Sequence, residues 1–207
     1  MCGFVGYVND TPDKSVNEKI IKDMADRIRH RGPDQDDYYV DSSVSLGFRR
    51  LSIIDLDGGS QPILNEDGTK VLVFNGEIYN YQPIREELIK KGHVFRTKTD
   101  SEVLLHGYEE YGCELLNKLR GMFAFVIWDS TEKKLFGARD IFGIKPFFYY
   151  LKDGNFLFGS EIKSFLSNPL FEKELNEERL PDYLCFEYIP TTETMFKNVY
   201  KLSLIHI

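Results

Sequence analysis

The sequence predicts an α+β sandwich, in which short β-strands and helices form separate blocks of the chain. Runs of β-branched and aromatic residues, bounded by Gly, Asn and Asp, recur along the sequence and are typical of short strands. Segments with apolar residues at helical spacing stand between these runs. Of the 207 residues, 42% are hydrophobic, and the 16 Phe and 12 Tyr can fill a sizeable core.

The N-terminal part combines strands with one helix. Residues 2–8 are apolar enough to form a buried strand. Asp13 or Ser15 can cap a helix, because apolar residues follow at helical spacing. These apolar residues are Val16, Ile20, Met24 and Ile28. The segments expected next are a polar break at 30–34, strands at 38–40 and 44–51, and a Gly-rich loop at 55–60.

An Asn-Gly pair at residues 75–76 lies between two β-type runs, 71–74 and 77–81. Such a pair is the strongest short-range signal for a hairpin, so we expect a tight turn there. A turn at this place does not exclude a functional role for the same two residues.

Two helices and two hairpins are expected after this pair. Pro83 is typical of a helix start and Gly92 of a helix end. Asp100 stands at the N-cap position of a second helix, residues 101–111, and most Asp residues at such a position are only caps. The expected hairpins join 122–129 to 134–139 and 147–151 to 156–159. From residue 168 the chain consists of short helical pieces and turns.

Charge and composition exclude several classes of protein. The net charge is −7 and no basic stripe is visible, which argues against nucleic acid or an anionic membrane as a partner. No apolar run is long enough to span a bilayer, and we expect no secretory signal, because no basic segment leads into an apolar one at residues 1–20. The three cysteines and four histidines lack metal-ligand spacing. A cytoplasmic location is expected, with Cys113 and Cys185 as packing residues.

Cys2 is the first candidate for chemistry. A small second residue favours removal of the initiator Met, so we expect the mature chain to begin at Cys2. One residue would then carry a thiol and an α-amine, whose pKa of roughly 7.7–8.0 suits it to accept the thiol proton. The alternative is a buried cysteine early in an apolar strand.

A thiol that attacks an amide needs further groups. Asn75 and Gly76 could stabilise an oxyanion, Arg50 could hold a carboxylate, and Asp100 could hold an ammonium group. Each has a structural alternative: a turn for the Asn-Gly pair, a surface cation for Arg50 and a helix cap for Asp100. Glycine-rich phosphate loops and the GxSxG serine-hydrolase motif are absent from the sequence.

Residues 2–6, CGFVG, resemble the start of class II glutamine amidotransferases. Further segments resemble the glutamine-dependent asparagine synthetases within that class, and the resemblance runs to about residue 202. These segments are HRGPD at 30–34, RLSIID at 50–55, QP at 61–62, FNGEIYN at 74–80, TDSE at 99–102, RGMFAF at 120–125, RD at 139–140, GIKP at 143–146 and SEIK at 160–163.

The resemblance implies a fold and a set of roles. The fold is the N-terminal-nucleophile hydrolase four-layer αββα sandwich. Cys2 would be the nucleophile and its amine the base in hydrolysis of L-glutamine to glutamate and ammonia through a thioester. The other implied roles are glutamine binding by Arg50 and by the backbone of Leu51, Ser52, Ile53 and Ile54, an oxyanion hole at Asn75 and Gly76, and ammonium binding by Glu77 and Asp100.

The resemblance also divides the chain. Residues 2–167 correspond to the glutaminase domain, which is expected to need no cofactor and no metal. Residues 168–202 correspond to the lead-in to a synthetase domain in cis. That domain would use ATP and Mg²⁺ with the ammonia to convert aspartate to asparagine. The expected partners are L-glutamine and this synthetase domain, and formation of a homodimer stays open. Nucleic acid and membranes are not expected as partners.

Residues 203–207 depart from the pattern of the resembled family, in which Pro and Gly follow Leu202. Together with Leu202 they match the translation of a sequencing-adapter end, so we expect them to be foreign to the protein. A natural short chain is the alternative. Two alternatives to the function also stay open: a different carboxylate acceptor, such as a sugar acid or a peptide precursor, and an inactive glutamine-binding fragment. Residues 186–202 favour the ordinary synthetase.

Overall fold

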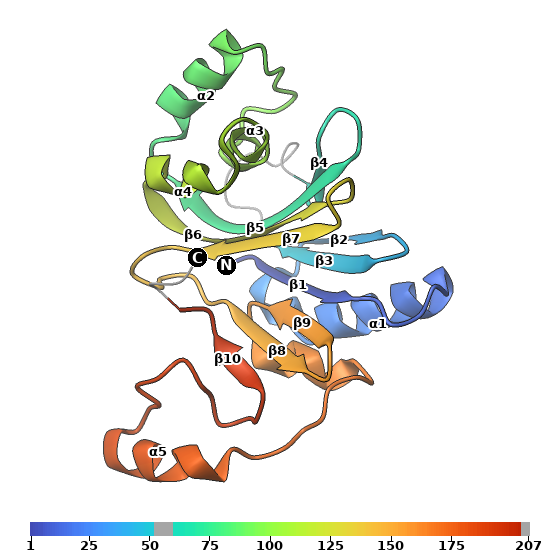
Figure 1. Ribbon diagram of the computed structural model, residues 1–207, viewed down its shortest axis with the longest axis vertical. Helices are drawn as coiled ribbons and strands as arrows, with labels where there is room; N and C mark the ends of the chain where they lie inside the picture. The colour runs from blue at the N-terminus through green and yellow to red at the C-terminus, as the bar shows by residue number, and fades with distance from the viewer. Residues whose placement is uncertain (52–59, 204–207) are drawn as a thin grey trace.

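The computed structural model describes residues 1–51 and 60–203, in which two antiparallel sheets stack face to face (Figure 1). One sheet has the strand order β10-β8-β9-β1-β3-β2 and the other the order β4-β5-β6-β7. The first consists of β1 (Gly3–Val8), β2 (Gln35–Val40), β3 (Val44–Arg50), β8 (Phe148–Lys152), β9 (Asn155–Gly159) and β10 (Val199–Lys201). The second consists of β4 (Ile63–Leu64), β5 (Lys70–Ile78), β6 (Gly121–Asp129) and β7 (Lys134–Arg139).

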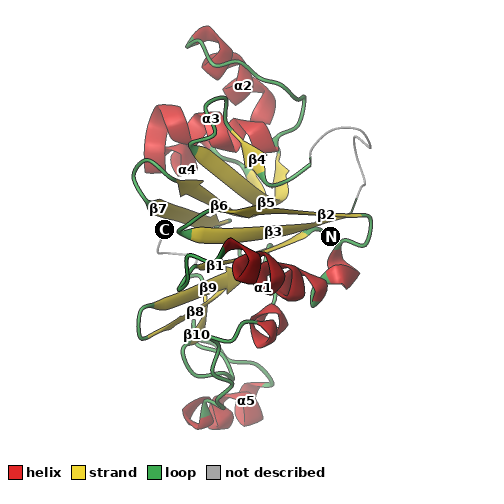
Figure 2. Cartoon of the chain, turned by 90° about the vertical axis from the view of Figure 1, so that its right-hand side faces the viewer, coloured by secondary structure: helices red, strands yellow, loops and turns green. Residues whose placement is uncertain are grey.

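Helices cover the outer faces of both sheets, so the molecule has four layers (Figure 2). Helices α2 (Tyr81–Lys90), α3 (Ser101–Tyr111) and α4 (Leu115–Lys118) lie on the four-stranded sheet, and α1 (Lys14–Asp26) lies on the six-stranded sheet. A further short helix, α5 (Leu180–Phe186), lies apart from these layers. The expected αββα sandwich is confirmed.

Three buried clusters correspond to the three interfaces between the layers, and the alternation of side chains along each strand decides which cluster a residue joins. On β5, Leu72 and Phe74 pack with the helices, whereas Val71 and Val73 pack between the sheets. The third cluster joins α1 to the six-stranded sheet. The period of two thus decides which interface each buried strand residue faces, including the polar ones.

The predicted helix start at Asp13 and the two predicted hairpins are confirmed. The Asp13 carboxylate accepts hydrogen bonds from the N–H groups of Ser15, at 2.9 Å, and Val16, which satisfies free donors in the first turn of α1. Strands β6 and β7 form one hairpin, and β8 and β9 form the other.

The tight turn expected at Asn75-Gly76 is wrong. Strand β5 continues through both residues, which pair in register with Ala124 and Phe123 of β6. The local signal is overridden because a turn would interrupt the nine-residue ladder with β6. Gly76 serves close strand packing instead, since a Cβ atom there would lie 2.2 Å from the carbonyl oxygen of Met122.

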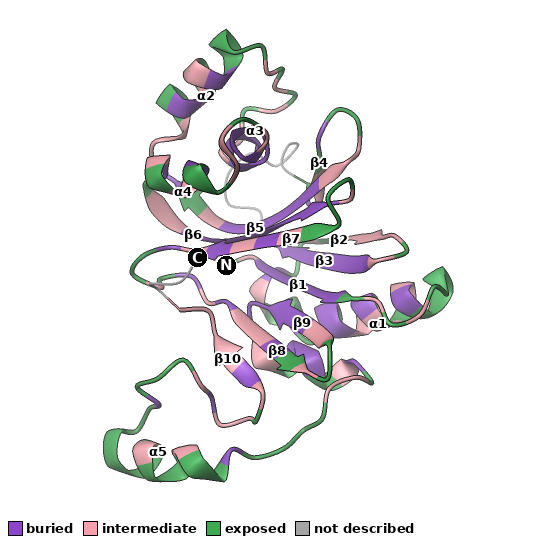
Figure 3. Ribbon diagram, viewed as in Figure 1, coloured by how far each residue is buried: buried purple, intermediate pink, exposed green. Residues whose placement is uncertain are grey.

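The prediction that Cys113 and Cys185 are packing residues is also wrong, because both are exposed. Cys113 lies in the turn between α3 and α4, and Cys185 lies on α5, most of which is exposed (Figure 3). Neither the turn nor α5 directs these side chains toward a core, so the residue type alone does not indicate whether a cysteine is buried here.

The segment from residue 168 returns to the six-stranded sheet. Strand β10 pairs with β8, and the N–H of Leu202 donates to the carbonyl of Phe147 at 2.9 Å. That residues 168–202 lead into another domain stays a prediction, and residues 204–207 lie outside the described structure. Among the described residues, no helix is long and apolar enough to cross a membrane.

We predict that Gly6→Ala lowers the free energy of unfolding by about 1–3 kcal/mol. Gly6 pairs with Phe158 across β1 and β9, and a Cβ atom at Gly6 would lie 2.3 Å from Phe158 Cζ. Urea denaturation measures the change. Phe158→Leu removes the clashing ring, so the double variant should lose less stability than the sum of the two single variants. Additive losses would contradict the predicted contact.

Candidate functional site

Strand alternation directs Cys2, Arg50 and Asn75 into the layer between the two sheets. Side chains two positions apart on a strand point to the same face. Cys2, Arg50 and Asn75 each lie two positions from a residue of the inter-sheet cluster, namely Phe4, Phe48 and Val73, respectively. Gly3 pairs with Arg49, so the next position along this antiparallel register places Cys2 opposite Arg50. The fold therefore brings together residues that the sequence separates by up to 73 positions.

The Cys2 thiol lies at the end of β3. Its Sγ atom lies 3.4 Å from the Leu51 nitrogen and 3.7 Å from the Leu51 carbonyl oxygen. Cys2 is partly buried and packs against the inter-sheet cluster. The next three residues predicted to bind glutamine, Ser52, Ile53 and Ile54, lie outside the described residues.

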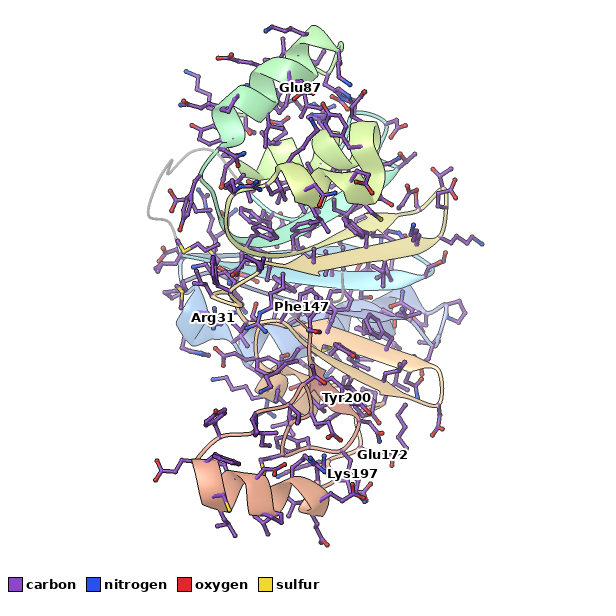
Figure 4. The ribbon with its side chains drawn as sticks, turned by 60° about the vertical axis from the view of Figure 1, so that its left-hand side comes forward. Arg31, Glu87, Phe147, Glu172, Lys197 and Tyr200 are labelled. Carbon is purple, nitrogen blue, oxygen red and sulfur yellow. The ribbon has the colours of Figure 1, made fainter. Side chains whose placement is uncertain are left out.

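Arg31 anchors the main chain of Cys2 and was not singled out from the sequence. Its Nε donates to the Cys2 carbonyl at 2.9 Å, and its Nη1 donates to Glu161 Oε1 at 3.0 Å. Burial opposes ionisation of Glu161, but hydrogen bonds from Arg31, His30 and Lys163 hold the pKa of this carboxyl below its ordinary value. Figure 4 labels Arg31.

The stem of Arg31 also explains the glycine after Cys2. A Cβ atom at Gly3 would lie 2.9 Å from Arg31 Cδ and 2.9 Å from Nε. The side chain of Arg31 is only 10% exposed, so it has little room to move aside. Arg31 of the HRGPD segment thus fixes the position of the main chain at Cys2 and Gly3.

Arg50 is buried rather than a surface cation, since only 8% of the residue is exposed. Its Nη1 donates to Gln35 Oε1 at 3.3 Å, and its carbonyl accepts a hydrogen bond from the N–H of Asp34 at 3.2 Å. A guanidinium group held beside Cys2 between the sheets can bind a carboxylate in two parallel hydrogen bonds.

The edge of β5 away from β6 carries a row of N–H groups. The N–H of Phe74 donates to Gln61 Oε1 at 2.6 Å, and the N–H of Ile78 donates to Asp100 Oδ2 at 2.7 Å. Gly76 lies midway between them, and alternate residues of a strand direct their N–H groups to the same side. The Gly76 N–H therefore points to this edge, between Gln61 and Asp100.

Asn75 supplies a second donor next to that N–H. The residue is 3% exposed, and its Nδ2 has no hydrogen-bond partner among the described residues. An unpaired buried amide N–H is costly, so such a group in a native structure requires an explanation. A side-chain amide and a neighbouring backbone N–H are donors of the kind that stabilise an oxyanion.

Asp100 does not act as a helix cap. Its side chain makes no capping hydrogen bond to α3 and instead accepts the hydrogen bond from Ile78 on β5. The pKa of Asp100 is raised above its ordinary value, mainly by burial. The hydrogen bond from Ile78 lowers this pKa, and the negative charge of exposed Glu77 raises it further. A partly buried carboxylate without a described cation is suited to bind an ammonium group.

One cluster of metal-ligating residue types lies elsewhere, on α3 and in the loop after α2. Ligand atoms of His93, His106 and Glu109 lie within 4.8 Å of one another, although the sequence spacing gave no sign of it. His106 Nδ1 forms a hydrogen bond of 2.8 Å with Glu109 Oε2, and both histidines lie within 4 Å of carboxylate oxygens. We interpret this cluster as a network of ion pairs.

The site by Cys2 is suited to acyl transfer through a thiol, with oxyanion donors on β5 and opposite charges at Arg50 and Asp100. The chain belongs to the glutamine amidotransferase domain family, whose model matches residues 1–207. It is 47% identical to glutamine-hydrolyzing asparagine synthetase 1 of Bacillus subtilis over 98% of this chain and 32% of that protein. It is 41% identical to glutamine-hydrolyzing asparagine synthetase 2 of Arabidopsis thaliana over 79% of this chain and 28% of that protein.

The chain thus spans about a third of the length of these relatives. Among solved structures, glutamine phosphoribosylpyrophosphate amidotransferase from B. subtilis matches with a TM-score of 0.66 and 20% identity, over 84% of this chain and 45% of that one. This likeness concerns the fold alone, and it confirms the expected N-terminal-nucleophile sandwich.

We predict that Arg31→Met lowers the free energy of unfolding by about 2 kcal/mol or more, because the Cys2 carbonyl and Glu161 lose charge-assisted hydrogen bonds. Urea denaturation is again the measurement. Arg27→Met is the matched control, since the Arg27 side chain is exposed and its one hydrogen bond among the described residues goes to the Ser167 hydroxyl. This change should alter stability by less than about 0.5 kcal/mol. Equal losses in the two variants would show that Arg31 does not anchor Cys2.

Proposed function

We propose that this domain hydrolyses L-glutamine to glutamate and ammonia at Cys2. The observation that carries the proposal is the buried Nδ2 of Asn75, which has no hydrogen-bond partner among the described residues. Strand alternation directs this side chain into the same inter-sheet layer as the Cys2 thiol. Oxyanion formation at a glutamine amide would give this donor its missing acceptor. Membership of the glutamine amidotransferase domain family supports the choice of substrate.

Arg50 and Asp100 fit the two ends of the amino acid. Arg50 would hold the α-carboxylate, aided by the backbone of Leu51 and residues 52–54, while Asp100 and Glu77 would face the α-ammonium group. The N–H groups of Gly76 and Ile78 are about 7 Å apart along β5, estimated from the strand rise. The side-chain carbonyl of glutamine at Gly76 and its ammonium at Asp100 can span such a separation.

In the first half-reaction, the α-amine of Cys2, free after removal of Met1, takes the thiol proton. The thiolate attacks the side-chain carbonyl carbon of glutamine, and the electron pair of the C=O bond moves to oxygen, beside Asn75 Nδ2 and the Gly76 N–H. When the C=O bond re-forms, the C–N bond breaks. The Cys2 ammonium returns its proton to the leaving nitrogen, so that ammonia departs and a glutamyl thioester remains.

The second half-reaction uses the same groups. The Cys2 amine takes a proton from water, whose oxygen attacks the thioester carbon. The oxyanion again forms beside Asn75 and Gly76. Collapse breaks the C–S bond, glutamate leaves, and the thiolate regains a proton from the ammonium. The thiol and amine thus return to their starting state without a cofactor.

We further propose that the ammonia serves a synthetase domain in cis that uses ATP and Mg²⁺ to convert aspartate to asparagine. The names and lengths of the relatives support this, and no residue of this chain is assigned to ATP or Mg²⁺. The acceptor could be another carboxylate, since acceptor-binding residues would lie in that domain. A cytoplasmic setting fits three cysteines that form no disulfide.

We predict that Asn75→Ala lowers kcat for glutamine hydrolysis by roughly 10²–10³-fold with little change in KM, because one oxyanion donor is lost. Steady-state release of glutamate is the measurement. Asn117→Ala removes an exposed amide that bonds Glu114, and it should leave both constants unchanged. A change in KM alone would argue that Asn75 binds the ground state instead.

The decisive test of the function is the intact mass of the protein before and after treatment with 6-diazo-5-oxo-norleucine, a reactive glutamine analogue. We expect loss of Met1 and a single adduct that maps to Cys2 and is prevented by excess glutamine. Cys2→Ala should give no adduct and no glutaminase activity. Exposed Cys113 and Cys185 serve as internal controls for non-selective alkylation. Retained Met1, or a folded mature chain without an adduct, would refute the proposed glutaminase.

A further inference from the structure

The turn that carries Asp100 is built from hydroxyl groups. Thr97 Oγ1 and Thr99 Oγ1 share a hydrogen bond of 2.8 Å, and the Ser101 hydroxyl donates to Thr99 Oγ1 at 3.2 Å. Asp100 itself bonds across to Ile78 on β5. The place of its carboxylate therefore depends on how this turn is fixed to the rest of the domain.

Glu102, in the first turn of α3, fixes the turn. Its Oε1 accepts the N–H of Arg96 at 2.7 Å, and its Oε2 accepts both the N–H of Thr97, at 2.8 Å, and the Thr97 hydroxyl, at 2.7 Å. Only 4% of Glu102 is exposed. These three hydrogen bonds stabilise the carboxylate, and a cation nearby would stabilise it further, because burial of a charge away from water is costly.

His106 is that cation. It lies one helical turn after Glu102 and is 1% exposed, with Nε2 located 3.7 Å from Glu102 Oε1. The other titratable groups that face it are Glu109 on α3, Glu66 in the loop before β5, and His93 after α2, whose ring centroid lies 5.2 Å away. Nε2 has no hydrogen-bond partner among the described residues, so its link to Glu102 is mainly one of charge.

The protonation states agree with this geometry. Burial lowers the pKa of His106, but the surrounding carboxylates outweigh it and raise the pKa to about 9. Burial likewise opposes ionisation of Glu102, but His106 and the donors of Arg96 and Thr97 lower its pKa to about 2. Near neutral pH the two residues form a buried imidazolium–carboxylate pair.

We propose that His106 is a positioning residue for substrate recognition: its charge keeps Glu102 ionised, Glu102 holds the Arg96–Thr99 turn, and the turn presents Asp100 to the ammonium group of glutamine. Helix α3, which carries the pair, lies on the outer side of the sheet that contains β5, so the pair acts on the site without contact with substrate (Figure 1). This inference rests on the proposed glutaminase function and names a determinant of its amino-acid specificity.

The substitution His106→Gln tests the inference. The Gln side chain keeps much of the shape of the imidazole and carries no charge. We expect KM for glutamine to rise by about tenfold, the scale of a lost contact to a charged group, while kcat stays near the wild-type value. Labelling of Cys2 by 6-diazo-5-oxo-norleucine measures the fraction of folded sites. The matched control is His93→Gln, which lies in the same cluster but contacts Glu110 and Glu109 rather than Glu102, and its KM should be unchanged.

A second substrate separates positioning from general loss of structure. Glutaramate is glutamine without its α-amine, so it has no group for Asp100 to bind. The ratio of kcat/KM between wild type and His106→Gln should be about tenfold for glutamine and near one for glutaramate. Equal ratios for the two substrates, or an unchanged KM for glutamine, would overturn the inference while leaving the glutaminase itself intact.

Removal of both charges should partly restore binding. Glu102→Gln alone removes one of the two carboxylates nearest Nε2 of the buried His106, and leaves Glu66 and Glu109 in contact. Glu102→Gln with His106→Gln leaves two neutral groups in place of the pair. We therefore expect KM of the double variant to be lower than the product of the two single effects predicts. Independent effects would count against the charge pair.

NMR titration of the imidazole tests the pair without any reliance on glutaminase activity. His106 should titrate near pH 9 in the wild type and at a lower pH in Glu102→Gln, which also serves if His106→Gln fails to fold. Because the folded-state pKa is raised, the contribution of His106 to the unfolding free energy is full below about pH 6.5 and is lost as the pH rises through about 9. A His106 pKa near the ordinary 6.5 would overturn the inference.

Discussion

The register between β1 and β3 is the constraint on which the site depends. With Gly3 opposite Arg49, Cys2 and Arg50 both face the interior of the sandwich, and Arg49 faces α1, where it pairs with Asp26. A shift of either strand by one residue would turn its own group, the thiol on β1 or the guanidinium on β3, to the opposite face of the sheet and away from β5. Packing of Phe4 and Phe48 between the sheets opposes such a shift, so the hydrophobic core also fixes the geometry of the reacting groups.

Much of the fold was predictable from local signals. The periodic helix after Asp13 and the two C-terminal hairpins have patterns that neighbouring residues determine. The Asn75-Gly76 turn failed because two nearby residues cannot reveal that β6 pairs along the whole of β5. Similarly, cysteine is usually a buried residue, but Cys113 and Cys185 are exposed. Their exposure depends on which side of the turn or helix packs against a core.

The candidate site was predictable only in part. Cys2, Arg50, Asn75 and Asp100 follow from the chemistry that each residue type supports, and the structure brings the first three into one layer. The residues that hold them gave no such signal. Arg31 reaches Cys2 across 29 positions. Gln61 bonds the N–H of Phe74 through one oxygen atom, and His106 acts on Glu102 through its charge. Contacts of this kind depend on tertiary packing and leave no periodic pattern in the sequence.

The edge of β5 has a consequence for the kind of molecule that can enter the site. An open strand edge is a template on which any extended peptide can add as another strand. Here side chains already accept hydrogen bonds from two of the three N–H groups on this edge, through Gln61 at Phe74 and Asp100 at Ile78. No side chain within residues 1–51 or 60–203 bonds the N–H of Gly76 between them. A peptide backbone needs the whole row, whereas a single amide needs one donor. The same edge therefore resists the addition of a further strand at these residues, and its one remaining donor suits a single amide group better than an extended peptide backbone.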